Sequence, residues 1–166
     1  MPDLTKHAEL LMGLIFIASL SLILVALGSQ HIGDLVPCDL CYKQRWAYYS
    51  AIALIPIALF LYGRDFKNFS RYLLIAMAVI FFANTLLGIY HSGVEWELWA
   101  GPTGCTETGN LSDTIDLLGE LENVKIVPCD KVQWSLLGIS MAGYSALASL
   151  GLGLLSFGTA FKAFDK

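Results

Sequence analysis

Residues 10–29 read LLMGLIFIASLSLILVALGS and contain no charged side chain. A helix needs roughly 20 apolar residues to cross the hydrocarbon core of a bilayer, so this stretch is long enough to span a membrane. Three further stretches, at about 46–62, 72–90 and 134–157, come close to the same requirement. We therefore predict an all-α membrane protein, a four-helix transmembrane bundle that forms a single domain over residues 1–166.

The composition of the whole chain agrees with a membrane protein. Of its 166 residues 56% are hydrophobic and only 14% are charged. The first stretch follows Lys6 as the apolar part of a signal peptide would, but Gly28-Ser29-Gln30 is a poor cleavage site, and we expect the segment to be retained. The net charge of -4 and the lack of a Lys/Arg run argue against nucleic-acid binding.

The distribution of basic residues predicts the orientation of the bundle, because Lys and Arg collect on the cytoplasmic side of membrane proteins. Six of the ten basic residues fall on one side of the expected spans, namely Lys6, Arg64, Lys67, Arg71, Lys162 and Lys166. On the other side, segment 91–133 carries eight acids against two lysines. Both termini should therefore be cytoplasmic, and segments 30–45 and 91–133 should form loops on the outer face.

The long outer loop contains one segment with helical periodicity. Leu111, Ile115, Leu118 and Leu121 recur at helical spacing among acidic residues. This pattern predicts a short amphipathic helix that lies on the membrane surface.

The fourth apolar stretch carries small residues one helical turn apart. Gly138, Ala142 and Ala146 follow one another at a spacing of four. Such rows let helices approach closely in lipid, so we expect this face of the fourth helix to pack against a neighbour.

All four cysteines fall in the two expected outer loops. Cys38 and Cys41 form a Cys-x-x-Cys pair just before the second apolar stretch, and such a pair beside a helix start can cycle between dithiol and disulfide. Cys105 and Cys129 lie in the long loop, 24 positions apart. On the outer side of the membrane thiols can be oxidised and stay oxidised.

A zinc site and structural disulfides are the alternatives to redox chemistry. Zinc ligands usually come in pairs with two to four residues between them, a spacing that only Cys38 and Cys41 satisfy, so we expect no metal. A structural disulfide between Cys105 and Cys129 would contribute roughly 3.5 kcal/mol of stability. A bridge between Cys38 and Cys41 restrains little chain, and we therefore favour a redox relay over structural disulfides.

Arg45 lies one turn after Cys41, on the helix face that the two cysteines of the pair share. Its outer position runs against the cytoplasmic preference of basic residues. A guanidinium here would stabilise the Cys41 thiolate and the developing oxyanion of a reduced acceptor. It would equally serve as a snorkelling side chain at the end of the span, and position alone leaves both roles open.

Together these features resemble the bacterial DsbB family, and the resemblance covers nearly the whole chain. It rests on the long-loop cysteine pair and on two motifs, Pro37-Cys38-x-x-Cys41-x-x-x-Arg45 and Gln133-Trp134-x-x-Leu137-Gly138. The resemblance implies a thiol oxidase of the bacterial inner membrane whose cysteine loops face the periplasm. Such an enzyme reoxidises a periplasmic thioredoxin-like oxidase of the DsbA type and passes the electrons to a membrane quinone, ubiquinone or menaquinone.

The resemblance also implies a role for each cysteine. Cys105 would receive the attack of the partner's thiolate, and Cys129 would be released. Cys129 would then attack Cys38 and leave Cys41 as the thiolate that faces the quinone.

Two further residues gain a quinone-binding role through the resemblance. Arg45 would lie beside Cys41 at the quinone, and His91 matches a position that DsbB proteins use near it. From the residues alone His91 is an interfacial histidine.

Two other functions stay open at this point. A vitamin K epoxide reductase-like enzyme also pairs a Cys-x-x-Cys with loop cysteines in a four-helix bundle, although its Cys-x-x-Cys lies at a later helix. A non-enzymatic membrane scaffold would use the same cysteines as structural disulfides.

Overall fold

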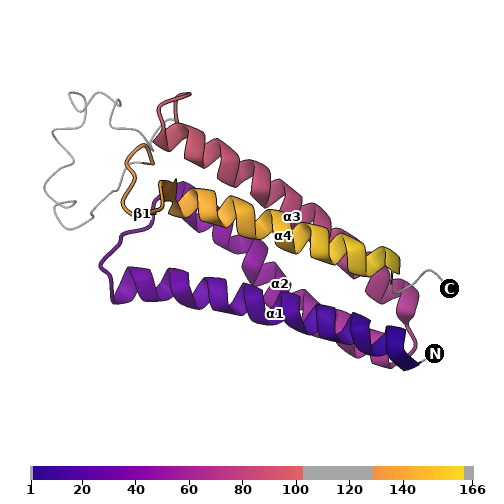
Figure 1. Ribbon diagram of the computed structural model, residues 1–166. Helices are drawn as coiled ribbons and strands as arrows, with labels where there is room; N and C mark the ends of the chain where they lie inside the picture. Colours follow the sequence, from indigo (N-terminus) through magenta and orange to yellow (C-terminus); the bar gives the residue numbers. More distant parts are fainter. Residues whose placement is uncertain (1, 103–128, 163–166) are drawn as a thin grey trace, which may run out of the picture.

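Four long helices make up most of the chain that the computed structural model describes, residues 2–102 and 129–162 (Figure 1). They are α1 (Pro2–His31), α2 (Asp39–Gly63), α3 (Lys67–Glu95) and α4 (Met141–Lys162). Each contains a window long and apolar enough to cross a membrane. The prediction of four such helices is thus confirmed, whereas their orientation in the membrane stays a prediction.

The helices extend beyond the apolar stretches that predicted them. α1 continues to His31 and α2 begins at Asp39, so the connection between them is shorter than the expected loop 30–45. α3 continues to Glu95, past the expected end at 90. Polar residues at a membrane surface can remain helical because the backbone hydrogen bonds of the span continue into them.

The start of the fourth helix differs from the expectation. Residues 134–140 are not helical, because Leu137 (φ 52°) and Gly138 (φ 78°) have left-handed backbone conformations. Two consecutive residues of this kind form the tight turn of a hairpin. The turn joins β1 (Ser135–Leu136) to β2 (Ile139–Ser140), which pair antiparallel, and α4 begins directly after them. Gly138 therefore belongs to this turn, and the expectation that it joins the small-residue row of the helix is wrong.

The interface between α3 and α4 is the most extensive in the bundle. Ala142 and Ala146 of the expected small-residue row are both buried, and Ala146 lies in this interface. A Cβ atom placed on Gly88 of α3 would lie only 2.8 Å from the Ala146 Cβ, so the two backbones are in direct contact. Small residues permit this approach, as expected for helices in lipid.

A buried polar network adds to the contact between α2, α3 and α4. The Tyr48 hydroxyl lies 2.9 Å from Ser149 Oγ and donates to the Ser145 carbonyl at 3.0 Å. Asn84 Nδ2 donates to Ser149 Oγ at 2.8 Å. The network links three helices at one level of the bundle, where each buried polar group finds a partner.

The buried side chains form two clusters. The large cluster contains residues of all four helices, among them Met12, Ile55, Met77 and Phe81. The small one, here called the cysteine cluster, consists of Cys38, Leu40, Val94 and Cys129.

The two ends of the bundle differ in content. The first residues of α1 and the last of α4 lie at one end, and the start of α2 and the β1–β2 hairpin lie at the other (Figure 1). Cys38 is at the start of α2, so the cysteine cluster lies at the end of the bundle opposite the first residues of α1 and the last of α4. Cys105 and the amphipathic helix expected at 111–121 lie outside the described residues.

Candidate functional site

Cys38 caps the helix that carries the rest of the pair. Its backbone is extended (φ -77°, ψ 172°), and its Sγ accepts a hydrogen bond from the Cys41 backbone N–H at 3.3 Å. Pro37 precedes it. Because proline disfavours a helical conformation in the residues before it, the helix cannot extend further back, and α2 starts here. Cys41 consequently lies in the first turn, on the same side as Cys38, which confirms that the pair stands at a helix start.

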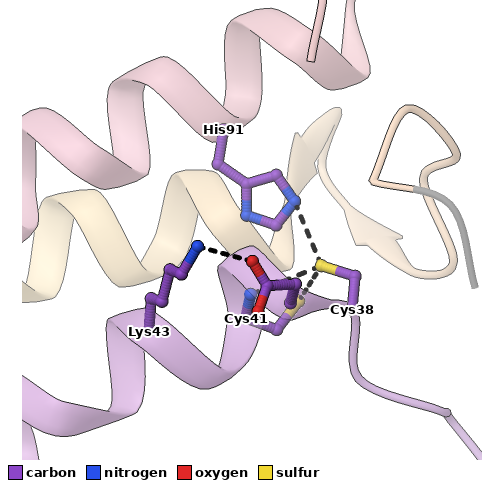
Figure 2. A network of polar contacts seen from close by, with 5 residues as sticks. Cys38, Cys41, Lys43 and His91 are labelled. Carbon is purple, nitrogen blue, oxygen red and sulfur yellow. Dashed lines mark hydrogen bonds and ion pairs between the residues drawn. The ribbon is translucent and has the colours of Figure 1, made fainter. Parts of the chain in front are cut away.

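The two sulfurs and a histidine form a compact group. Cys38 Sγ lies 2.8 Å from Cys41 Sγ and 3.5 Å from His91 Nε2. Figure 2 shows the imidazole of His91, which comes from α3, directed at the Cys38 sulfur. The other ring nitrogen, Nδ1, lies 2.8 Å from Gln44 Nε2 on α2. Gln44 therefore fixes the ring so that its Nε2 edge faces the cysteines.

The surroundings of Cys38 favour its protonated thiol. The hydrogen bond from this thiol to Cys41, together with burial of the sulfur, raises the pKa of Cys38 to about 12. His91 acts in the opposite direction and is outweighed. At neutral pH the reduced pair therefore keeps the proton on Cys38, and any thiolate of the pair resides on Cys41.

Cys129 packs into the same buried cluster as Cys38. Both side chains are almost fully buried, with 1% of Cys129 and 5% of Cys38 exposed. Four residues further along, Gln133 Nε2 donates to the Val36 carbonyl at 2.7 Å. This bond joins the segment after Cys129 to the connection before Cys38, so the structure brings together cysteines 91 positions apart in the sequence. Cys105 lies outside the described residues.

Arg45 is bound to the end of α1. Its Nη1 donates to Gln30 Oε1 at 2.8 Å and its Nη2 to the Ala26 carbonyl at 3.3 Å. The guanidinium also lies over the Tyr42 ring, 5.2 Å from the ring centre. Among the described residues no hydrogen bond joins Arg45 to Cys41, so the stabilisation of a Cys41 thiolate by Arg45 stays a prediction.

A cavity of about 640 Å³ lies beside these groups. It is bordered by the last third of α1, the start of α2, the end of α3 that carries His91, the hairpin region and the start of α4. Cys38, Cys41, Arg45 and His91 all line it, among mostly apolar side chains. Its size and lining suit a small, largely apolar ligand that meets a few polar groups.

The sequence reasoning did not identify three polar residues at this cavity. Gln44 and Glu95 line the cavity, and Gln30 binds Arg45. One oxygen of Glu95 is buried without a hydrogen-bond partner among the described residues. Gln30 and Gln44 stand directly beside apolar stretches, and that position is the signal that would have drawn attention to them. Glu95 lies five positions beyond its stretch, and the sequence gives no such signal for it.

The arrangement supports thiol–disulfide chemistry next to a ligand. The Cys38 and Cys41 sulfurs are close enough for a small side-chain rotation to bring them to the bonding distance of about 2.05 Å. Cys129 packs near Cys38, where its thiol can take part in thiol–disulfide exchange with the pair. The cavity lies beside Cys41. Cys38, Cys41 and His91 also offer three atoms to a metal, all within 4.8 Å of one another.

Comparison with known proteins agrees with this chemistry. The family described as "Disulfide bond formation protein DsbB" matches residues 8–158. The chain is 29% identical to the Disulfide bond formation protein B of Methylococcus capsulatus, over 88% of each chain. It is 27% identical to the protein of that name from Marinobacter nauticus, over 81% of each chain.

The comparison with solved structures gives no match. The family therefore rests on the family model and the relatives, and the four-helix architecture rests on the structure described above. With its cysteine pair at the head of such a bundle, the chain belongs to the DsbB family of membrane oxidoreductases for disulfide bond formation.

Proposed function

We propose that this protein reoxidises a periplasmic DsbA-like dithiol oxidase and passes the electrons to a membrane quinone, ubiquinone or menaquinone. The observation that carries the proposal is the Cys38/Cys41 pair, with its sulfurs 2.8 Å apart at the wall of a largely apolar cavity. A quinone ring is apolar, with two oxygens that become anionic on reduction. The cavity offers apolar walls, together with Arg45 and His91 as polar groups.

The proposed orientation follows from the charge distribution. With basic residues at the cytoplasmic side, both termini are inside and the cysteine end of the bundle faces the periplasm of a bacterial inner membrane. A soluble partner then reaches the loop that carries Cys105, and the lipid-dissolved quinone reaches the cavity.

The relay begins with four thiol–disulfide exchanges. A partner thiolate attacks Cys105 of a Cys105–Cys129 disulfide, which forms a mixed disulfide and releases Cys129. The partner's second thiol resolves the mixed disulfide, so the partner leaves oxidised. Cys129, which packs with Cys38 in the cysteine cluster, attacks Cys38 of a Cys38–Cys41 disulfide and releases Cys41. The Cys105 thiolate then attacks Cys129 of the resulting Cys38–Cys129 disulfide, which restores the Cys105–Cys129 disulfide and leaves Cys38 and Cys41 as the reduced pair. Each step requires an attacking thiolate and a good leaving thiolate.

The last step transfers two electrons to the quinone. The Cys41 thiolate is the donor because Cys38 holds its proton more tightly in the reduced pair. Arg45, held by Gln30 and Ala26, stabilises the developing oxyanion of the quinone. In the balanced reaction, a partner dithiol and a quinone give a partner disulfide and a quinol, with two protons transferred.

Substitution of the proposed electron donor tests this function. Purified protein with bound quinone is mixed with reduced DsbA-like partner, while quinone absorbance and trapped mixed disulfides are followed. Cys41→Ser should abolish quinone reduction, because no thiolate then faces the acceptor. Cys105→Ala should abolish the mixed disulfide with the partner. Ser50→Ala, a partly exposed site on the same helix whose hydroxyl donates to the helix backbone, is the matched control and should leave both readouts unchanged.

Two results would contradict the proposal. Quinone reduction at the wild-type rate by Cys41→Ser would exclude Cys41 as donor, and a mixed disulfide that persists in Cys105→Ala would overturn the order of exchange. Disulfides that resist mild reductant and never re-form with quinone would instead indicate a structural scaffold.

A further inference from the structure

The group formed by Cys38, Cys41 and His91 has the ligand types of a zinc site. Two thiolates and one imidazole are a known donor set for Zn²⁺, with the fourth position open to water. The three ligand atoms lie within 4.8 Å of one another. This site differs from the four-cysteine site that the sequence spacing disfavours, because it uses only the tight pair and a histidine from another helix.

The distances fit a tetrahedral ion with one small adjustment. Bond lengths of about 2.3 Å to sulfur and about 2.05 Å to nitrogen place tetrahedral S and N ligands roughly 3.5 Å apart. The Cys38 Sγ–His91 Nε2 distance is 3.5 Å. Two sulfur ligands should be roughly 3.8 Å apart, whereas the present Sγ–Sγ distance is 2.8 Å. Rotation of the partly exposed Cys41 side chain along the cavity wall supplies the difference.

Gln44 completes the site behind the histidine. Metal-binding histidines nearly always donate the hydrogen of their second ring nitrogen to a neighbouring acceptor. Gln44 lies 2.8 Å from His91 Nδ1, and a flip of its amide places the oxygen there as acceptor, since the two amide orientations are interchangeable in shape. Nε2 is then unprotonated and directed at the sulfurs.

Charge balance also favours the ion in this environment. Two thiolates and one Zn²⁺ are neutral together, so no net charge is buried in the apolar cavity wall.

We infer that the reduced form of the protein binds one Zn²⁺ through Cys38, Cys41 and His91, and that the ion stops oxidation of the pair. Binding releases the two thiol protons and changes no oxidation state. Each sulfur coordinates the bound ion and is no longer a free thiolate, so the pair forms no disulfide until the ion leaves.

Cobalt is the probe for the test, because Co²⁺ occupies zinc sites and is coloured. Fully reduced protein in detergent, without quinone or partner, is titrated with Co²⁺. One ion per chain should produce a thiolate-to-cobalt charge-transfer band and the d–d bands of tetrahedral cobalt, and Zn²⁺ should displace it. Protein with a Cys38–Cys41 disulfide should give no such bands.

Variants identify the ligands. His91→Ala should weaken cobalt binding at least tenfold, and Gln44→Leu should weaken it about 10- to 100-fold, as expected for loss of a supporting partner. His31→Ala, an exposed histidine at the end of α1, should change nothing. The double variant Cys105→Ser/Cys129→Ser should keep the bands. Bands that survive His91→Ala unchanged, or that vanish in the double variant, would overturn the inference.

The inhibitory effect rests on the proposed function and is measured separately. Zn²⁺ at one ion per chain should block quinone reduction by the reduced protein, and a chelator should restore it. Full quinone reduction with the site loaded would refute the block. If zinc-free protein fails to reduce quinone, the proposed function is wrong, while the cobalt spectra still decide whether the metal site exists.

Discussion

The α3–α4 interface and the cavity beside α1 are built in opposite ways within one bundle. At the interface a Cβ atom on Gly88 would lie 2.8 Å from the Ala146 Cβ, so there is no room for a methyl group. On α1, Gly28 lines the cavity and has no heavy atom within 4 Å of the position of a Cβ. Helices in lipid associate through close packing, so open space between them is a feature to explain.

The difference assigns separate tasks to the two regions. The tight interface fixes α3, and with it His91, relative to α4 and the hairpin that precedes it. The open region leaves a ligand-sized space next to Cys41 and Arg45. Binding sites in helical bundles are commonly formed between facing helices in this way. The site therefore depends on both regions. The tight interface positions side chains such as His91, and the open region admits the ligand.

The largest expected effect concerns the ionisation of Cys38 at the cavity. With its pKa raised from the usual 9.0 to about 12, the thiolate fraction of Cys38 at pH 8 falls about a thousandfold. Each thiolate becomes more nucleophilic as its pKa rises, which offsets part of this loss, so alkylation should be about 30- to 60-fold slower than for an ordinary thiol. Alkylation of the reduced protein by iodoacetamide, with Cys38 and Cys41 resolved by fragment mass spectrometry, measures the rate.

The pH profile separates ionisation from restricted access. Because the folded pKa is raised, the Cys38 rate should keep rising between pH 9 and 11. A thiol that is merely inaccessible would react slowly at every pH, and its rate would level off near its usual pKa of 9.0. Cys41→Ala removes the largest cause of the shift and should accelerate Cys38. A plateau near pH 9 in the wild type would refute the assignment.

The next effect distinguishes the two regions by one methyl group. Gly88→Ala should lower the free energy of unfolding by about 1–3 kcal/mol, since overpacking forces backbone shifts. The Ala146 Cα and N would lie 3.0 and 3.1 Å from the new Cβ, and backbone atoms cannot yield as a flexible side chain does. Gly28→Ala meets nothing and should be neutral or stabilising by up to about 1 kcal/mol, from helix propensity. Unfolding by a denaturing detergent, followed by circular dichroism, measures both.

Equal effects of the two substitutions would break the comparison. A strongly destabilising Gly28→Ala would mean that the region beside α1 is as tightly packed as the α3–α4 interface. A Gly88→Ala substitution that leaves the free energy of unfolding unchanged would mean that α3 and α4 can move apart with little loss of stability.

The four helices were predictable because each depends on the length and hydropathy of a single stretch of sequence. Length and hydropathy of a segment such as 10–29 decide that it spans, without knowledge of its neighbours. The start of α4 was not predictable in this way. Gly138 continues the small-residue row in the sequence, but its positive φ, together with that of Leu137, turns the chain from β1 into β2 before the helix begins. Spacing alone cannot separate a glycine that packs in a helix from one that turns the chain.

From the residues alone, without the family resemblance, the site was predictable only where its members lie close together in the sequence. Cys38 and Cys41 are three positions apart, and one helix start brings them together. The contact of His91 with Gln44 spans 47 positions and that of Arg45 with Gln30 spans 15, so both depend on how helices pack. Arg45 was expected at Cys41, but its hydrogen bonds run to α1, because the end of that helix offers an amide oxygen and a backbone carbonyl.

The smallest expected effect lies where the tight interface meets the cavity. Tyr48 lines the cavity, and its hydroxyl joins α2 to Ser145 and Ser149 of α4. Tyr48→Phe should lower the free energy of unfolding by about 0.6 kcal/mol, the average for hydrogen bonds between helices in a membrane. The loss is small because Ser149 keeps its bond from Asn84. Detergent unfolding measures it, with exposed Tyr72→Phe as the control. A loss above about 2 kcal/mol would mean that this hydroxyl, and not close backbone packing, holds α4 in place beside the cavity.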